Sequence, residues 1–78
     1  MPTDAPTTGD NIAAEMKRRR LSQEKLAAHL GLSQAAVSAR LRGVVDWRLA
    51  EITATAEWLG VPVTSLITDP EPEPAKAS

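Results

Sequence analysis

The sequence predicts an all-α protein, a compact bundle of four to five short helices, and three observations support this. Apolar residues recur at three- and four-residue steps between the two termini, and no segment alternates cleanly as a strand would. Capping residues, Asp or Ser before an apolar stretch and Gly after it, divide the chain into short units. The chain has no Cys, Phe or Tyr, so its core must be built mainly from aliphatic side chains.

The first two predicted helices each begin at a capping residue. Asp10 can cap a helix that ends near Arg20, and its apolar face is formed by Ile12, Ala13 and Met16. Ser22 can cap a second helix, with an apolar face formed by Leu26, Ala27 and Leu30. Gly31 follows as a residue that can adopt positive φ and end this helix.

The remaining helices follow the same pattern. Ser33 can cap a third helix with Val37 and Leu41 on one face, and Gly43 closes it. Either Val45 or Asp46 opens a fourth helix, whose apolar stripe is formed by Leu49, Ile52, Ala56 and Leu59. Gly60 ends the fourth helix, and a short fifth turn, VTSLI, follows Pro62.

The two terminal segments differ from the rest in composition. Residues 1–9 and 69–78 hold five of the six prolines and little apolar side chain, so we expect a disordered arm and a disordered acidic, Pro-rich tail. The folded domain is then 10–68, with eight Lys and Arg against six Asp and Glu. This weakly basic balance permits an anionic partner but does not establish one. Neither a signal peptide nor a membrane-spanning run is evident, so we expect a cytoplasmic protein without a membrane partner.

The dipeptide Ser-Gln occurs twice, at Ser22-Gln23 and Ser33-Gln34, eleven residues apart. Each copy lies at a predicted helix start, where Ser supplies the capping oxygen. The spacing leaves room for one helix of about two turns and a tight turn through Gly31. Two short helices joined in this way form a helix-turn-helix unit, whose second helix can enter the major groove of DNA.

The segment LSQEKLAAHLGLSQAAVS, together with Gly43 and the downstream AEWLGVPVTSL, resembles the Cro/CI-type (XRE) helix-turn-helix family of phage repressors and bacterial regulators. The resemblance covers about residues 12–67. Ala27, Gly31 and Val37 stand where this family has a small residue, a glycine and a branched apolar residue. The lambda-repressor-like fold is implied, and with it a sequence-specific regulator of transcription that binds an operator in double-stranded DNA.

Two features depart from the family pattern. Arg40 stands at a position that is usually apolar, and its helical angle places it at the edge of the core with an unknown role. Met16 and Leu41 occupy positions where many family members have a buried ion pair. Because both have become apolar together, and packed apolar groups can replace a buried ion pair without loss of stability, the change fits the same fold.

The third helix divides at 100° per residue into a polar or small face and an apolar face. The first face holds the expected base contacts Gln34, Ala35, Ser38 and Ala39, and for Gln34 and Ala35 the resemblance implies this role. Gln can pair with adenine and an Ala methyl can touch a thymine methyl, whereas the preference of Ser is open. The phosphate contacts expected are Gln23, Ser33, Arg42, Gly43 and Arg20. For the run from Lys17 to Arg20, favourable interaction with the helix dipole is an equal alternative.

Family members usually bind DNA as two-fold dimers, which implies a homodimer here, through Trp58, Val63 and Ile67. This apolar surface is small, so we expect a weak dimer, and its formation only on DNA is left open. The alternative is that these residues cover the core of a monomer. Trp47 is expected to anchor the turn between the third and fourth helices. His29 is the only His and lies on an outer face, so we expect no metal site. The apolar faces leave no room for a substrate pocket, and we expect no cofactor or small-molecule ligand.

No group of side chains has an arrangement suited to catalysis, so we expect no enzyme activity. The predicted function is that of a Cro-type repressor, from a phage or a bacterium, that acts by occupying its operator. Such a protein is expected to associate with the nucleoid. A helical protein-interaction module, antitoxin-like or an adaptor, is the alternative without DNA specificity. The operator sequence, the sign of regulation and the choice among Cro, immunity repressor and antitoxin are left open.

Overall fold

The computed structural model describes residues 7–67, and five helices account for most of them. In chain order these are α1 (Thr8–Arg19), α2 (Gln23–Leu30), α3 (Gln34–Leu41), α4 (Leu49–Leu59) and α5 (Thr64–Ile67). The predicted all-α class is therefore confirmed. The expected disorder of residues 1–6 and 69–78 lies outside the described residues. Within that range, none of the helices has both the length and the apolar character needed to cross a membrane.

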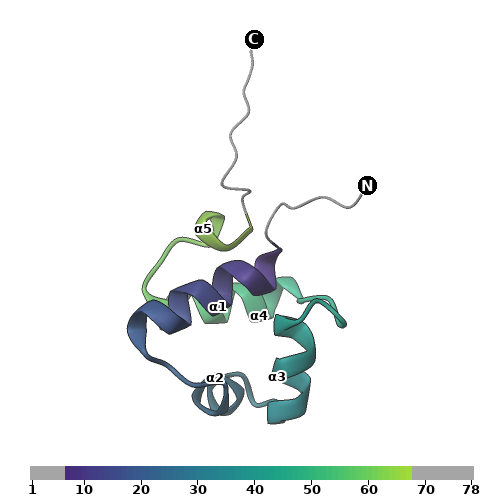
Figure 1. Ribbon diagram of the computed structural model, residues 1–78. Coiled ribbons are helices and arrows are strands. Elements are labelled where there is room, and N and C mark those ends of the chain that lie inside the picture. Colours follow the sequence, from purple (N-terminus) through teal and green to yellow (C-terminus); the bar gives the residue numbers. More distant parts are fainter. Residues whose placement is uncertain (1–6, 68–78) are drawn as a thin grey trace.

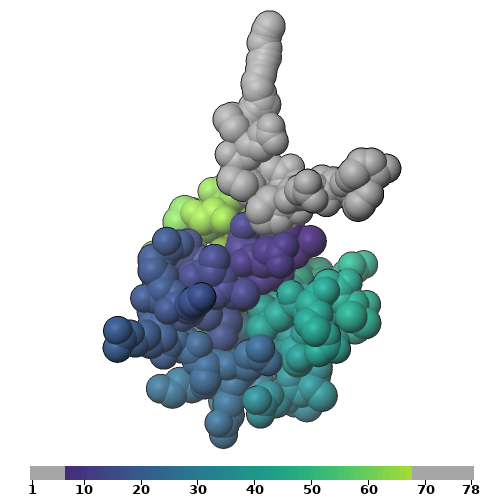
Figure 2. Space-filling model, in the orientation of Figure 1, coloured from purple at the N-terminus to yellow at the C-terminus, as the bar shows by residue number. Residues whose placement is uncertain are grey.

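Helix α1 runs through the middle of the fold, where it contacts α3, α4 and α5 (Figure 1). Helix α2 contacts α3 and α4 and crosses α3 at a steep angle. Asn11 Nδ2 also donates to Leu66 O at 2.9 Å and so ties α1 to α5. Helices α2 and α3 form one end of the molecule, and α5 lies at the opposite end (Figure 2).

Helix α1 begins earlier than predicted. Thr7, not Asp10, is its N-cap: Thr7 Oγ1 accepts from Asp10 N at 3.1 Å, and Asp10 Oδ2 accepts from Thr7 N at 3.0 Å. Asp10 therefore acts as the third residue of a capping box, which leaves Thr8 and Gly9 inside the helix. Residues 7–9 thus belong to the cap and first turn of α1 rather than to an N-terminal arm.

The caps of α2 and α3 are those predicted. Ser22 Oγ accepts from Lys25 N at 3.2 Å, and Ser33 Oγ accepts from Ala36 N at 3.0 Å. Between the two helices, Gly31 has φ 72° in the left-handed region, where a residue with a Cβ is disfavoured. Each of these bonds joins groups close together in sequence, which explains why the pattern could be recognised without the tertiary structure.

Helix α4 begins later than predicted. Neither Val45 nor Asp46 opens it, because Arg48 is the N-cap and its N–H donates to Glu51 Oε1 at 3.0 Å. Leu49 was expected on the core face but is 70% exposed. It is the first residue of α4, where the side chain is directed back beyond the start of the helix.

The core is aliphatic, as predicted, and all of the helices contribute to it. Its buried apolar residues are Ile12, Met16, Leu26, Ala27, Val37, Ile52, Ala56, Leu59 and Leu66. Leu30, Leu41 and Trp47 are half-buried and pack against this core. Ala13 is exposed, contrary to expectation, because the buried stripe of α1 runs through Gly9, Ile12 and Met16 and leaves Ala13 at its edge.

Candidate nucleic-acid interface

The helix-turn-helix unit presents one side of α3 to solvent. Val37 is 0% exposed and fixes the opposite side of the helix in the core. Gln34 and Ala35, in the first turn, are exposed, whereas Ser38 and Ala39 are half-buried. The predicted base-contacting residues therefore share one face of α3, but its first turn is the more accessible part.

Arg42 and the residues after it close the C-terminal end of α3. Arg42 Nη1 donates to Ser38 Oγ at 2.6 Å, so two of the expected DNA-contacting side chains are bonded to each other. Ala39 O accepts from Val44 N at 2.9 Å and from Val45 N at 3.3 Å. These bonds fold the chain back over the last turn of α3 and place Arg42 beside the exposed face.

The other expected phosphate contacts lie at helix ends. Gln23 is the first residue of α2 and Ser33 is the cap of α3, and both are exposed. Gly43 adopts φ 82° and Arg20 adopts φ 58°, both in the left-handed region. For a non-glycine residue this conformation costs about 1 kcal/mol, and Arg20 ends α1 in it with its side chain exposed.

The basic run of α1 divides into two parts. Arg18 Nη2 lies 3.1 Å from Glu15 Oε2, and Arg19 also pairs with the Glu15 carboxylate. Lys17, by contrast, lines a surface depression together with Gln23. The structure therefore brings Lys17, but not the two paired arginines, next to an expected phosphate contact.

The three residues expected at a dimer surface do not form one exposed patch. Trp58 and Val63 are half-buried and pack against the core of their own chain, whereas Ile67 is 51% exposed. The Trp58 ring stacks on His29, with centroids 5.7 Å apart and planes at 21°. Two further apolar side chains, Val44 at 69% and Leu49 at 70%, are more exposed than Ile67, and neither was expected at a dimer surface.

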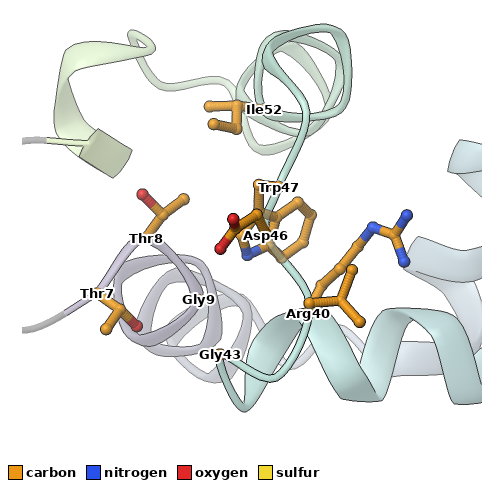
Figure 3. A pocket seen from close by; sticks show the side chains of 9 residues that line it. Thr7, Thr8, Gly9, Arg40, Gly43, Asp46, Trp47 and Ile52 are labelled. Atoms are coloured by element: carbon orange, nitrogen blue, oxygen red, sulfur yellow. The ribbon is translucent and has the colours of Figure 1, made fainter.

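A hollow of about 400 Å³ lies between the start of α1 and the loop before α4 (Figure 3). Thr8 and Gly9 line one side of it, and Asp46 and Trp47 line the other. Trp47 packs against the core as expected of an anchor, and its buried Nε1 has no hydrogen-bond partner among the described residues. Arg40 borders the hollow with its aliphatic part, and its guanidinium points away from it.

Arg40 has a role that sequence reasoning left open. Its Nε donates to Glu51 Oε1 at 2.9 Å and its Nη2 to Oε2 at 3.2 Å, which forms a two-point ion pair between α3 and α4. These side chains are only 12% and 14% exposed. The available signal was an Arg at an apolar position of the motif, followed by a Glu in the first turn of the next helix.

Several solved structures are similar to this fold, including the following three. The crystal structure of a hypothetical transcription factor, NHTF, from Neisseria has a TM-score of 0.75 and 28% sequence identity, covering 90% of this chain and 88% of that chain. The restriction-modification controller protein C.AhdI from Aeromonas hydrophila has a TM-score of 0.70 and 28% identity, covering 77% of this chain and 91% of that chain. These similarities agree with the predicted helix-turn-helix fold.

The third structure is the P22 c2 repressor protein in complex with a synthetic operator, with a TM-score of 0.71. At 22% identity, covering 80% of this chain and 94% of that chain, this likeness concerns the fold alone. No curated protein matches the sequence. The protein-family model described as the BetR domain matches residues 5–76. The chain therefore belongs to the BetR domain family.

Proposed function

We propose that this chain binds double-stranded DNA through α3 and regulates transcription. The observation that carries the proposal is the exposed first turn of α3, with Gln34 and Ala35, in a helix that Val37 anchors in the core. A helix held in this way can enter the major groove with its N-terminal residues against base edges. The similar structures of a hypothetical transcription factor and a restriction-modification controller protein, each at 28% identity, support the same function.

The chemistry of α3 suits direct readout of bases. Gln34 can accept from and donate to adenine, and the Ala35 methyl group can contact a thymine methyl group. Ser38 accepts a hydrogen bond from Arg42 but retains its own hydroxyl proton for a base acceptor. Ala39 lies deeper than Ala35 and would be reached only by a closely approaching base pair.

Phosphate contacts would hold α3 in register on the duplex. Gln23 and Ser33 lie where free backbone N–H groups and the helix dipole attract an anion. Arg42, Gly43 and Arg20 would complete the set, and Lys17 is placed beside Gln23 to assist. Such contacts provide affinity and orientation but no sequence information.

Within this function, we favour a repressor of the Cro type that acts by occupying its operator. A second copy would supply the second recognition helix, since one helix reads too few base pairs for specificity in a genome. The dimer surface would include the exposed Ile67 and the half-buried Trp58 and Val63. The exposed Val44 and Leu49 favour one rival function, a helical protein-interaction module.

Selection of duplexes from a random library, followed by titration of the selected site, tests DNA binding. We expect Gln34→Ala to lose about 1–3 kcal/mol on that site and to relax the preference at one base pair. Arg42→Ala should weaken selected and random duplexes alike and lower the salt slope by about one unit. A chain that selects no sequence and shows no salt-dependent binding would favour the protein-interaction module instead.

A further inference from the structure

The ion pair between Arg40 and Glu51 has no part in the proposed DNA contacts. Arg40 uses Nε and Nη2 for the Glu51 carboxylate, and its Nη1 donates to Ala36 O at 3.1 Å. Each guanidinium nitrogen therefore has a partner within the chain. Because only 12% of the Arg40 side chain is exposed to solvent, this residue is also not accessible to a phosphate.

Glu51 holds both ends of the loop that joins α3 to α4. Its Oε1 accepts from Arg40 Nε, in the last turn of α3, and from Arg48 N, at the start of α4. Helix α3 packs mainly against α1 and α2, and α4 also packs against these two helices. The pair α3–α4 is not among the main helix contacts, so this carboxylate is a direct polar link between two elements that share little other contact.

The loop that this link closes, residues 42–48, begins with two of the expected phosphate contacts, Arg42 and Gly43. Apart from the half-buried Trp47, the residues of this loop are exposed, with Val44 at 69%. Arg42 N and Gly43 N also donate to Ser38 O and Arg40 O, and Val44 N and Val45 N both donate to Ala39 O. Of the loop's side chains, Arg42 bonds to Ser38 and Trp47 packs against the core. Little apolar burial therefore holds the first half of this loop, and its position depends on a few polar contacts.

We propose that Arg40 and Glu51 are positioning residues, which fix the loop 42–48 against the last turn of α3 and so hold Arg42 and Gly43 where they can bind phosphates. The proposal rests on the proposed DNA-binding function. It assigns no DNA contact to either residue. It also explains why a charged residue, Arg40, stands at a place of the helix-turn-helix motif that is usually apolar.

The direction in which one substitution changes the affinity for DNA distinguishes this positioning role from a simple effect of charge. Glu51 carries a negative charge, so Glu51→Gln makes the protein more positive and by charge alone should tighten binding to a polyanion. If the carboxylate positions the loop, the same substitution weakens binding. Glu57→Gln is the matched control, because Glu57 lies exposed in the same helix and its loss changes the charge equally.

A second variant keeps the charge unchanged. Glu51→Asp retains a carboxylate at the third position of α4, where Asp10 shows in α1 that Asp can accept the N-cap N–H. The shorter side chain keeps this cap but draws the carboxylate back from Arg40. Glu51→Asp therefore removes the link to α3 without removing the cap or the charge, and it should fold even if Glu51→Gln does not.

The experiment measures binding of a labelled random-sequence duplex of about 20 base pairs, which reports phosphate contacts. We expect affinities about tenfold weaker for Glu51→Asp and Glu51→Gln, and unchanged or tighter binding for Glu57→Gln. Amide hydrogen exchange supplies a readout that needs no DNA. Val44 and Val45 amides should exchange faster in both Glu51 variants, while the core amide of Val37 in Glu51→Asp stays close to wild type.

The proposal would be overturned if Glu51→Asp bound the duplex as tightly as wild type, or if the Val44 and Val45 amides kept their protection in that variant. Equal loss of protection at Val37 would also overturn it, since Glu51 would then support the whole fold rather than the loop. Failure of the wild-type chain to bind any duplex would instead overturn the proposed function, and the role in DNA binding with it. The exchange data would still show in that case whether Glu51 holds the loop.

Discussion

Thr55 shows how much a single buried polar group can matter in a core of this size. Its side chain is 0% exposed, and its hydroxyl has no hydrogen-bond partner among the described residues. A buried polar group without a partner loses its hydration and gains nothing in return, at a cost of about 1–3 kcal/mol.

Replacing this hydroxyl with a methyl group should therefore stabilise the protein. We expect Thr55→Val to raise the free energy of unfolding by about 1 kcal/mol, because the volume stays the same and the unsatisfied group disappears. Urea unfolding measures the change, and Thr53→Val, at a half-buried position of the same helix, is the control. A loss of stability would mean that the Thr55 hydroxyl bonds to a backbone carbonyl of the preceding turn.

At the scale of elements, the contact between α1 and α3 is set by Gly9. A Cβ at this position would lie 2.6 Å from Leu41 O and 2.8 Å from Arg40 O, both of them backbone atoms of α3. The two helices can approach this closely only because residue 9 has no side chain. The first turn of α1 thereby abuts the carbonyl end of α3, an arrangement in which the helix dipoles attract.

Gly9→Ala should lower the free energy of unfolding by about 1–3 kcal/mol, because one of the two backbones must move. Helix propensity alone predicts the opposite, an increase of about 1 kcal/mol in the free energy of unfolding when Ala replaces Gly. Thermal unfolding of this variant therefore decides between the two effects. Ala13→Gly, at an exposed position of α1, measures the propensity term by itself, and a more stable Gly9→Ala would show that the helices do not touch here.

At the scale of the whole molecule, stability should fall in acid. A hydrogen bond from Arg19 holds the pKa of Glu15 below its ordinary value of 4.5, and a hydrogen bond from Arg40, opposed by burial, does the same for the pKa of Glu51. A carboxylate with a lowered pKa in the folded state stabilises the protein above the unfolded pKa. This contribution is lost as the pH falls from 4.5 through the lower folded value.

Melting temperatures between neutrality and strong acid test this dependence. We expect the wild type to lose stability below the ordinary Glu pKa, and the gap between wild type and Glu51→Gln to narrow as the pH falls. The gap narrows because protonated Glu51 loses the same interaction that the substitution removes. A gap of constant size, with Glu57→Gln behaving like wild type, would show that the charge of Glu51 does not stabilise the fold.

The assembly on DNA is also a property of the whole molecule. If the proposed dimer forms through Ile67, Ile67→Ser should weaken two-to-one complexes on a palindromic duplex while leaving the monomer folded. Leu49→Ser is the matched control, because Leu49 is another exposed apolar residue in a different part of the fold. Sedimentation of the complexes measures the stoichiometry. If Leu49→Ser has the larger effect, the dimer surface lies at the start of α4 instead.

Much of this fold could be predicted because its signals are local. Ser22 and Ser33 cap helices by bonding to backbone groups three residues away, and Gly31 ends α2 with its own backbone conformation. Such features depend on neighbouring residues and not on which helices pack together. The helix-turn-helix and the exposed face of α3 follow from them. The start of α1 was misplaced because Thr7 and Asp10 are both capping residue types, three residues apart, and the earlier one holds the cap. The start of α4 was misplaced because Asp46 is such a type, whereas Arg48 holds the cap.

Only the tertiary structure decided how distant residues meet. Arg40 finds Glu51 across a loop, Trp58 folds onto the core and His29, and Leu49 is left exposed. Periodicity places each of these side chains on a face of its own helix but does not state what covers that face. The sequence by itself therefore determined the helices and the DNA-reading candidates on α3. The tertiary structure decided which charges are paired and which apolar side chains are free, because both depend on the neighbours that packing brings together.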